Sequence, residues 1–275
     1  MYGLFTNFNF WLIAVSLLVL VAERIRPWRP QRLLRPEIRQ DLFWFIFNSF
    51  VVVSVLGWLF DALRHPVDYG FRLVTGSYPF QMGVLNKLPL WQQAIVILVA
   101  GDFLEYLVHN SLHRVPVLWR FHRIHHSIHV MDWIGNLRFH WVELLVYFVV
   151  KYAPMTALGG EARALLVTSV FSLSIGHLNH SNLNISWGPL RYVLNSPRLH
   201  IWHHDKIPRG NYGVVFSAWD WMFGTAYMPV KIDMPDSIGY SGDEHLPKSL
   251  LWRFALPFLD SPKAPRKGQE TRISS

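Results

Sequence analysis

The chain has 275 residues, of which 51% are hydrophobic and 16% are charged, whereas an average soluble domain has roughly 25% charged residues. This apolar excess favours a membrane protein, and the absence of cysteine excludes disulfides and thiolate metal ligands. The net charge of +8 comes from basic residues that flank apolar segments, so we expect them to face an anionic membrane surface and no nucleic acid.

Apolar segments, taken in chain order, predict four to five helices that cross or enter a membrane. Residues 4–23 and 42–63 are each long enough to span a bilayer core of about 30 Å. A third segment covers residues 90–108. Residues 141–158 and 162–180 predict a tight helical hairpin. Charged residues in its first limb leave open whether that limb crosses the membrane or is re-entrant or tilted.

The loops predict the orientation and the division of the chain. Residues 24–40 contain six arginines, whereas residues 64–89 contain three basic residues, so the positive-inside rule places the first loop in the cytoplasm. Counting spans from there places every histidine-rich segment on the cytoplasmic face. The predicted regions are N-terminal membrane helices (1–63), a non-cytoplasmic loop (64–89), a histidine-box membrane and cap domain (90–228) and a C-terminal extension (229–275) with a disordered end.

Histidines are concentrated between His109 and His204, a stretch that holds twelve of the fourteen in the chain. One pair stands four residues apart, and two HxxHH boxes repeat the spacing i, i+3, i+4. On a helix such residues fit within an arc of about 100°, so the imidazoles of each box can converge on one point. The predicted metal ligands are His109, His113, His122, His125, His126, His177, His180, His200, His203 and His204.

Ten imidazoles exceed the roughly four to six ligands that one ion takes, so the sequence predicts two metal ions. Imidazole suits zinc, copper, iron and nickel, and the ligands alone do not select among these metals. His65 and His245 lie outside the set, and we interpret them as ordinary core or surface residues.

Three segments resemble the fatty acid hydroxylase/sterol desaturase superfamily of membrane enzymes. They read DFLEYLVHNSLHRVPVLWRFHRIHHS (102–127), RFHWVE (138–143) and NSPRLHIWHHDKIPRGNYGVVFSAWDWMFGT (195–225). The resemblance implies an all-α integral membrane protein with a cytosolic helical cap that carries the histidine boxes. It also implies two iron ions held by histidines alone and O2-dependent hydroxylation or desaturation of a lipid C–H bond. The membrane would be a bacterial inner membrane or the endoplasmic reticulum.

The resemblance carries over to individual residues. Its boxes match, in chain order, His109 and His113, then His122, His125 and His126, then His200, His203 and His204. His180 matches an isolated histidine after the hairpin, but His177 stands three residues before it, where some members have a step of four. His140 and Glu143 match an element of the form H-P-x-E, in which Trp141 replaces the proline.

Four further residues are predicted to assist the metal centre: Asp102, Glu105, His140 and Asp220. Asp102 lies two helical turns before His109, near the end of an apolar helix, where a carboxylate is costly unless it faces a partner. We therefore expect it to accept a hydrogen bond from a ligand imidazole. Glu105, one turn before His109, could do the same.

Electrons for such a reaction must come from another protein, because the chain has no GxGxxG motif, CxxCH motif or iron–sulfur cysteines. The expected donor is a cytochrome b5-like protein, a ferredoxin or a rubredoxin. Basic residues around the boxes could receive an acidic donor or lipid phosphates. They are Arg114, Arg120, Arg123, Arg198 and Lys206.

Two other classes of protein compete with the oxygenase. A histidine-rich metal transporter would distribute its ligands across the depth of the membrane, whereas these ligands are predicted on one side. A zinc-dependent membrane hydrolase typically has HExxH or an open three-ligand site, and HExxH is absent here. The sequence leaves open hydroxylation against desaturation, and a sterol, a fatty acyl chain or an ether lipid as substrate.

Overall fold

The computed structural model describes residues 7–76, 83–229 and 234–259. Within these ranges the chain is helical and has no strand, apart from two isolated β-bridges, Leu194 with Phe216 and Asp205 with Ile238. The predicted all-α class is therefore confirmed. The predicted disordered end of the chain lies outside the described residues.

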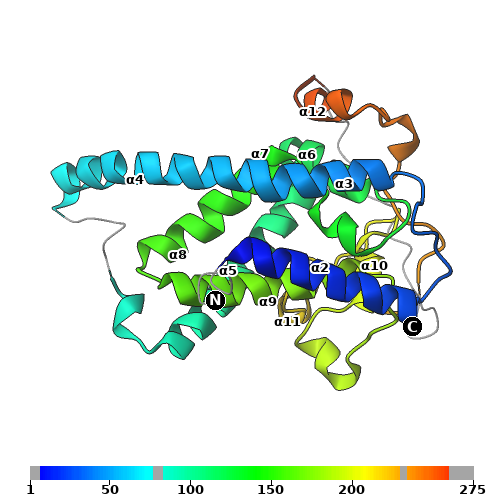
Figure 1. The fold of residues 1–275 in the computed structure, drawn as a ribbon, viewed down its shortest axis with the longest axis horizontal. Coiled ribbons are helices and arrows are strands. Elements are labelled where there is room, and N and C mark those ends of the chain that lie inside the picture. The colour runs from blue at the N-terminus through cyan, green and yellow to red at the C-terminus, as the bar shows by residue number, and fades with distance from the viewer. Residues whose placement is uncertain (1–6, 77–82, 230–233, 260–275) are drawn as a thin grey trace.

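Three helices among the described residues are long and apolar enough to cross a membrane (Figure 1). The first is α2 (Phe8–Ile25). The second is a continuous 38-residue helix, Ile38–Thr75, made of α3 (Ile38–Ile46), the π-helical η1 (Phe47–Val52) and α4 (Val53–Thr75). The third is α5 (Leu90–Arg114).

The second helix extends further than the sequence predicts. A loop was expected from residue 64, but the helix continues through Pro66 to Thr75, where Gly76 ends it in the left-handed region with φ 76°. A helix of this length measures about 57 Å, which exceeds a bilayer core of about 30 Å. The C-terminal part of this helix therefore lies beyond the apolar segment and is still helical.

The predicted hairpin is present, although neither limb is among the three candidate spans. Its first limb is broken into α7 (Trp141–Tyr147), the π-helical η5 (Phe148–Tyr152) and α8 (Ala153–Ala157), and its second is α9 (Ala162–His180). Gly159 makes the turn possible, since it has φ 81° and a Cβ there would lie 2.9 Å from the backbone of Gly83.

Shorter elements form the cap around the histidine boxes. They are α6 (Pro116–His126), η4 (Trp133–Leu137), η6 (Gly188–Tyr192), α10 (Pro197–His203), α11 (Ala218–Phe223), η7 (Asp243–His245) and α12 (Leu250–Leu259). The short η3 (Leu85–Lys87) lies instead at the hairpin turn, where the N–H of Leu85 donates to the carbonyl of Leu158. Both α6 and α10 begin with proline, whose fixed φ suits the first turn of a helix. Because each box follows such a start, its histidines lie on a helix as the spacing predicts.

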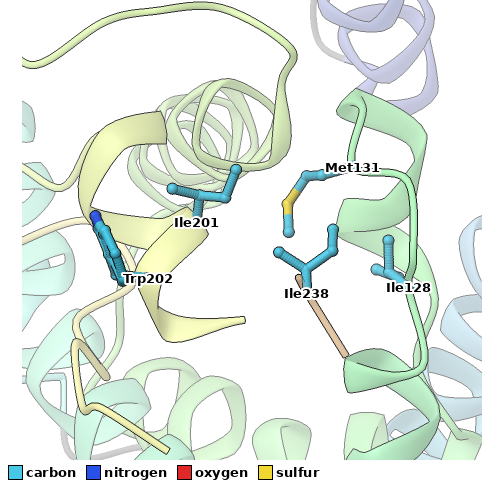
Figure 2. Packing of buried hydrophobic residues seen from close by; sticks show 5 residues of the cluster. All are labelled: Ile128, Met131, Ile201, Trp202 and Ile238. Carbon is cyan, nitrogen blue, oxygen red and sulfur yellow. The ribbon is translucent and has the colours of Figure 1, made fainter. Parts of the chain in front are cut away.

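A hydrophobic cluster joins the turn after the first HxxHH box to the second HxxHH box itself and to the segment around Ile238. It contains Ile128, Met131, Ile201, Trp202 and Ile238, all buried. Figure 2 shows Ile201 of α10 facing Met131 and Ile238 across the cluster. This packing fixes α10 against the turn after α6, so the two boxes are held close together.

Buried ion pairs fix the same region from the N-terminal side. Arg35, in the loop between α2 and α3, forms two hydrogen bonds to Asp132, at 2.7 and 2.5 Å, and one to Asp41 at 2.7 Å. Arg138 in turn donates to Asp41 at 2.5 Å and to the carbonyl of Ser127 at 3.0 Å. Ser127, the residue directly after the His122–His126 box, is thus connected to α3 through Arg138 and Asp41.

Candidate metal centre

Nine of the ten predicted ligands come together in two groups. Within each group, one ring nitrogen from every histidine lies within 4.8 Å of the others. The first group is His109, His113, His122, His126 and His203, and the second is His125, His180, His200 and His204. The two groups are adjacent, since the rings of His126 and His204 stack at 4.4 Å.

Each HxxHH box contributes to both groups, which differs from the expectation that a box converges on one point. On α6, His122 and His126 belong to the first group, whereas His125 belongs to the second. On α10 the assignment is reversed, because His200 and the C-cap His204 belong to the second group and His203 to the first. Residues four apart therefore share a group, and the residue between them faces the other group.

The spacing of the Nε2 atoms fits a metal ion in each group. Neighbouring Nε2 atoms lie 3.0 to 3.2 Å apart in the pairs His113–His122, His122–His126, His125–His180, His180–His200 and His200–His204. Two nitrogens that are each about 2.1 Å from one ion, and at right angles, would lie about 3.0 Å apart. This agreement supports metal coordination.

The outer nitrogens fix the tautomers of several rings. Three rings donate Nδ1–H to backbone carbonyls: His109 to Tyr212 at 2.8 Å, His203 to Gly210 at 2.8 Å and His180 to Gly176 at 2.9 Å. A carbonyl only accepts, so the Nε2 lone pairs of these rings point into the groups. The Nε2 of His203 is buried and has no hydrogen-bond partner. A metal ion bound to its lone pair would satisfy it.

Burial keeps the imidazoles of the cap neutral. It lowers the pKa of His122, His125 and His126 on α6 well below the usual range, and neighbouring histidines lower it further. The same causes act on the pKa of His200 and His204. Because a metal binds the neutral ring, the site is prepared for a cation at neutral pH.

Glu143 is the one carboxylate among the described residues for which a hydrogen bond to a predicted ligand is seen. Its Oε1 lies 2.8 Å from Nδ1 of His122, and the carboxylate is fully buried. An ionised carboxylate there fixes the tautomer of the ring and raises its basicity as a ligand. In the sequence, Glu143 matches a family element to which this role was not assigned. A carboxylate in an apolar segment needs a partner, as Asp102 does, and this signal also points to Glu143.

Asp102 does not accept a hydrogen bond from a ligand imidazole, contrary to expectation. It accepts from the backbone N–H of Val215 at 2.8 Å and of Phe216 at 3.0 Å, and from Trp219 Nε1 at 2.8 Å. Those groups are nearer than any imidazole because α11 and its preceding loop pack against this turn of α5. Asp102 therefore attaches the loop to the helix that carries His109.

Asp220 also acts on the loop rather than on a ring. Its carboxylate accepts from the backbone N–H of Tyr212 and of Gly213, both at 2.7 Å. The carbonyl of Tyr212 is the acceptor for His109, so Asp220 positions a ligand through one intermediate residue. Gly213 is required here, since a Cβ would lie 2.4 Å from the carbonyl oxygen of Phe216.

Three further predicted site residues also lie away from the histidine groups. His177 lies outside both, with Nε2 3.0 Å from Ser16 Oγ and Nδ1 2.8 Å from the Asn136 amide. Glu105 forms an ion pair with Lys151. His140 caps α7 by accepting from the N–H of Val142 through Nδ1, and its Nε2 bonds the Phe254 carbonyl at 3.2 Å. Each thus has partners that hold helices together.

One side of the first group is more open than the rest. His113 is half-buried, whereas the other eight histidines of the two groups are buried. The rings of Trp119 and Tyr212 lie 5.2 and 5.1 Å from the ring of His113, and both side chains are themselves half-buried. His113 is therefore the ring of the nine that is least shielded from its surroundings.

Comparison with known proteins agrees with this geometry. Residues 94–225 match the family described as fatty acid hydroxylase. The chain belongs to the fatty acid hydroxylase family. The family and the three long apolar helices make it an integral membrane protein, and the resemblance found in the sequence is confirmed.

Three proteins of known name are similar in sequence to this fatty acid hydroxylase family member. Ornithine lipid hydroxylase OlsE of Rhizobium tropici is 34% identical over 191 residues, which cover 68% of this chain and 55% of that protein. Alkylglycerol monooxygenase of Caenorhabditis elegans is 33% identical over 139 residues, 48% of this chain and 26% of that protein. Very-long-chain aldehyde decarbonylase GL1-5 of Oryza sativa subsp. indica is 31% identical over 189 residues, 60% of this chain and 30% of that protein.

The chain thus spans about half the length of the first of these relatives and less than a third of the other two. No solved structure matches the chain.

Proposed function

We propose that this chain is a membrane-bound oxidoreductase that uses O2 to hydroxylate a C–H bond of a membrane lipid, with one iron ion in each histidine group. The observation that carries the proposal is the pair of adjacent groups, in which nine imidazoles and no carboxylate surround two points. Such a site suits a pair of transition-metal ions.

Iron is proposed because of the reaction. Oxidation of an unactivated C–H bond is cofactor chemistry that side chains cannot supply, and iron, when bound, supplies the reduction of O2 and the oxidising power. Zinc has no redox chemistry, although imidazole ligands would bind it. The protein's part is to hold the rings with their lone pairs inward and to exclude water, which the burial of eight of the nine rings achieves.

Hydroxylation of a lipid is proposed over desaturation because of the relatives. The names of two of them contain hydroxylase and monooxygenase, and both names refer to lipids, an ornithine lipid and an alkylglycerol. The three apolar helices support a position of the site beside a bilayer, from which a lipid could reach it. The half-buried edge of the first group at His113, beside Trp119 and Tyr212, is the route that we propose for the reacting carbon.

The electron donor is proposed to be a separate acidic redox protein that docks on the cytoplasmic face. Arg114 is exposed and lies one residue after His113, so it is well placed to attract such a donor. Lys206, by contrast, already forms an ion pair with Asp243 at 3.0 Å. We therefore expect Arg114 to affect donor-dependent turnover, and its dependence on salt, more than Lys206 does.

The experiment that tests the proposal starts with metal content. The protein is purified under anaerobic conditions with 57Fe, and iron per chain is measured together with its Mössbauer spectrum. We expect about two irons per chain. His203→Ala should lower occupancy of the first group and His125→Ala that of the second, while the exposed His245→Ala (side chain 86% exposed) serves as the control.

Lipid oxidation is then measured with 18O2 and a reducing system, by mass spectrometry of the total lipid extract. A mass increase from one 18O atom in a lipid, absent from both group variants, supports hydroxylation. Loss of two hydrogens without 18O would show desaturation instead. Two results together would overturn the proposal and favour a zinc-dependent hydrolase. They are full zinc occupancy of the protein as purified and no O2 consumption after the protein is reloaded with iron.

A further inference from the structure

The last described helix, α12, has an outer face that no part of the described chain covers. The exposed residues on this face are all apolar: Leu251 (81% exposed), Trp252 (55%) and Leu259 (69%). They recur at a helical spacing, so they lie on one face. Phe258 lies at its edge, where its ring packs against Phe121 at 5.3 Å. An apolar face of this kind on a soluble surface would be an aggregation risk, which indicates that something covers it.

The inner face of α12 is anchored firmly to the rest of the molecule. Phe254 packs its ring against Trp44 at 4.8 Å and against Phe47 at 5.2 Å. Arg253 is buried and donates to the carbonyl of Pro247 at 2.8 Å and to Ser127 Oγ at 2.9 Å. The helix is therefore a fixed part of the fold, and its outer face has a fixed direction.

The depth of α12 follows from the helix it packs against. Gln40, the penultimate polar residue before the apolar segment of α3, donates through Nε2 to the backbone carbonyl of Lys248 at 2.9 Å. From there α12 passes Phe43 and Phe47, which lie in the first two turns of that apolar segment. The helix thus begins at the polar end of a candidate span and continues beside its apolar start. Figure 1 shows α12 at the upper edge of the view, above α3 and α6.

The outer face of α12 is also continuous with other apolar surface. On the neighbouring α3, Leu42 is 44% exposed and Ile46 is 55% exposed. Charged side chains lie at the polar end, where Lys248 and Arg39 are exposed. Apolar residues on one side and basic residues at the boundary are typical of helices that lie at the interface of an anionic bilayer.

We propose that α12 lies in the lipid beside the apolar start of the second helix, with its outer face embedded on the side of the bilayer where the histidine groups lie. Arg253 connects it to Ser127, the residue directly after His126. Embedding α12 therefore fixes the depth of α6, and of the metal centre, relative to the lipid. This inference does not depend on the reaction proposed above.

The test uses the absence of cysteine from the chain. Single variants Leu251→Cys and Leu259→Cys are made in the full chain, labelled with a nitroxide and reconstituted in vesicles of phosphatidylcholine and phosphatidylglycerol. Power-saturation measurements then compare the collision of each label with O2, which concentrates in lipid, and with a water-soluble nickel chelate. Val55→Cys, on the exposed lipid-facing side of α4 (49% exposed), and Glu244→Cys, on a charged exposed residue, are the two references.

We expect both α12 labels to favour O2 over the nickel chelate several-fold more than the label at Glu244 does, in the direction of the label at Val55. Labels at both α12 positions that behave like the one at Glu244 would overturn the proposal. So would exclusion of both reagents together with spin–spin broadening that disappears on dilution with unlabelled chain, because a second copy of the chain would then cover the face. Two label sites guard against a local disturbance at either one.

Discussion

At the scale of single residues, Glu143 has the most direct influence on a ligand. A carboxylate that accepts from a ligand imidazole typically changes metal affinity by about 10–100-fold. We expect Glu143→Gln to weaken iron binding in the first group by a factor in that range and to leave the second group unchanged, because only His122 contacts Glu143.

Competition with a chelator at increasing concentration, followed by iron analysis, would measure this loss. The exposed Glu244→Gln is the matched control. Equal affinity of the Glu143→Gln variant and the wild type would show that the carboxylate does not influence the metal.

Gly213 carries a second prediction at this scale. Gly213→Ala would put a methyl group 2.4 Å from a backbone oxygen and 2.8 Å from an oxygen of Asp220. The loop that holds Tyr212, and through it His109, must then shift. We expect Tm to fall by on the order of 5 °C and iron retention to decrease. In Gly57→Ala, the added Cβ meets nothing within 4 Å, so this variant should keep both properties, and an equal effect of the two changes would contradict the argument.

At the scale of elements, α9 presents two histidines in different directions. His180 belongs to the second group, whereas His177 faces Ser16 of α2 and Asn136 of η4. We expect His180→Gln to lose about one iron per chain and His177→Gln to retain about two. Iron analysis of both proteins decides the point. Loss of iron from His177→Gln at unchanged Tm would restore the ligand role predicted from the sequence.

The helices that carry the site were predictable because their signals are local. Period and spacing place the histidines of each box on one side of a helix, and the family resemblance locates the boxes. The division of each box between two groups was not predictable, because it depends on where α6 and α10 face each other. That arrangement comes from contacts between distant segments, such as Ile128 with Ile201.

The carboxylates show the same limit more sharply. The sequence marks Asp102 and Asp220 as residues that need partners, and both have them. Their partners are backbone N–H groups about 113 and 8 residues away along the chain, which no helical spacing indicates. Likewise, the second helix ends at Thr75 because Gly76 caps it. The apolar segment that predicted this helix ends earlier, at residue 63, so hydropathy did not indicate the end of the helix.

At the scale of the whole molecule, Glu37 connects distant regions of the chain. It lies between α2 and α3, and it contacts His129, Arg138 and Arg253. Burial alone would raise the pKa of Glu37, but the His129 imidazole 3.7 Å away and the charges of the two arginines lower it from 4.5 to about 2. The charged form is therefore favoured by the fold.

The sign of the pH effect follows from this shift. The folded pKa lies below the unfolded pKa. The stabilisation by Glu37 is therefore complete above about pH 4.5 and is lost as the pH falls towards about 2. Glu37→Gln should thus lower stability at pH 6 by on the order of 2 kcal/mol, or a few degrees in Tm. The difference from the wild type should shrink as the pH falls from 4.5 to 3.

The measurement is thermal unfolding of both proteins in detergent after metal removal. The Tm difference between them is compared at each pH, because titration of the ligand histidines acts on both proteins alike. Glu244→Gln, at an exposed position, should follow the wild type throughout. A Tm difference between Glu37→Gln and the wild type that stays constant from pH 6 to 3 would mean that the charge of Glu37 does not stabilise the fold. A difference that closes in this window would show that the charge of Glu37 stabilises the fold. One carboxylate would then join the loop before α3, the segment after the His122–His126 box and α12 into one cooperative unit, because its partners His129, Arg138 and Arg253 lie in the last two of these regions.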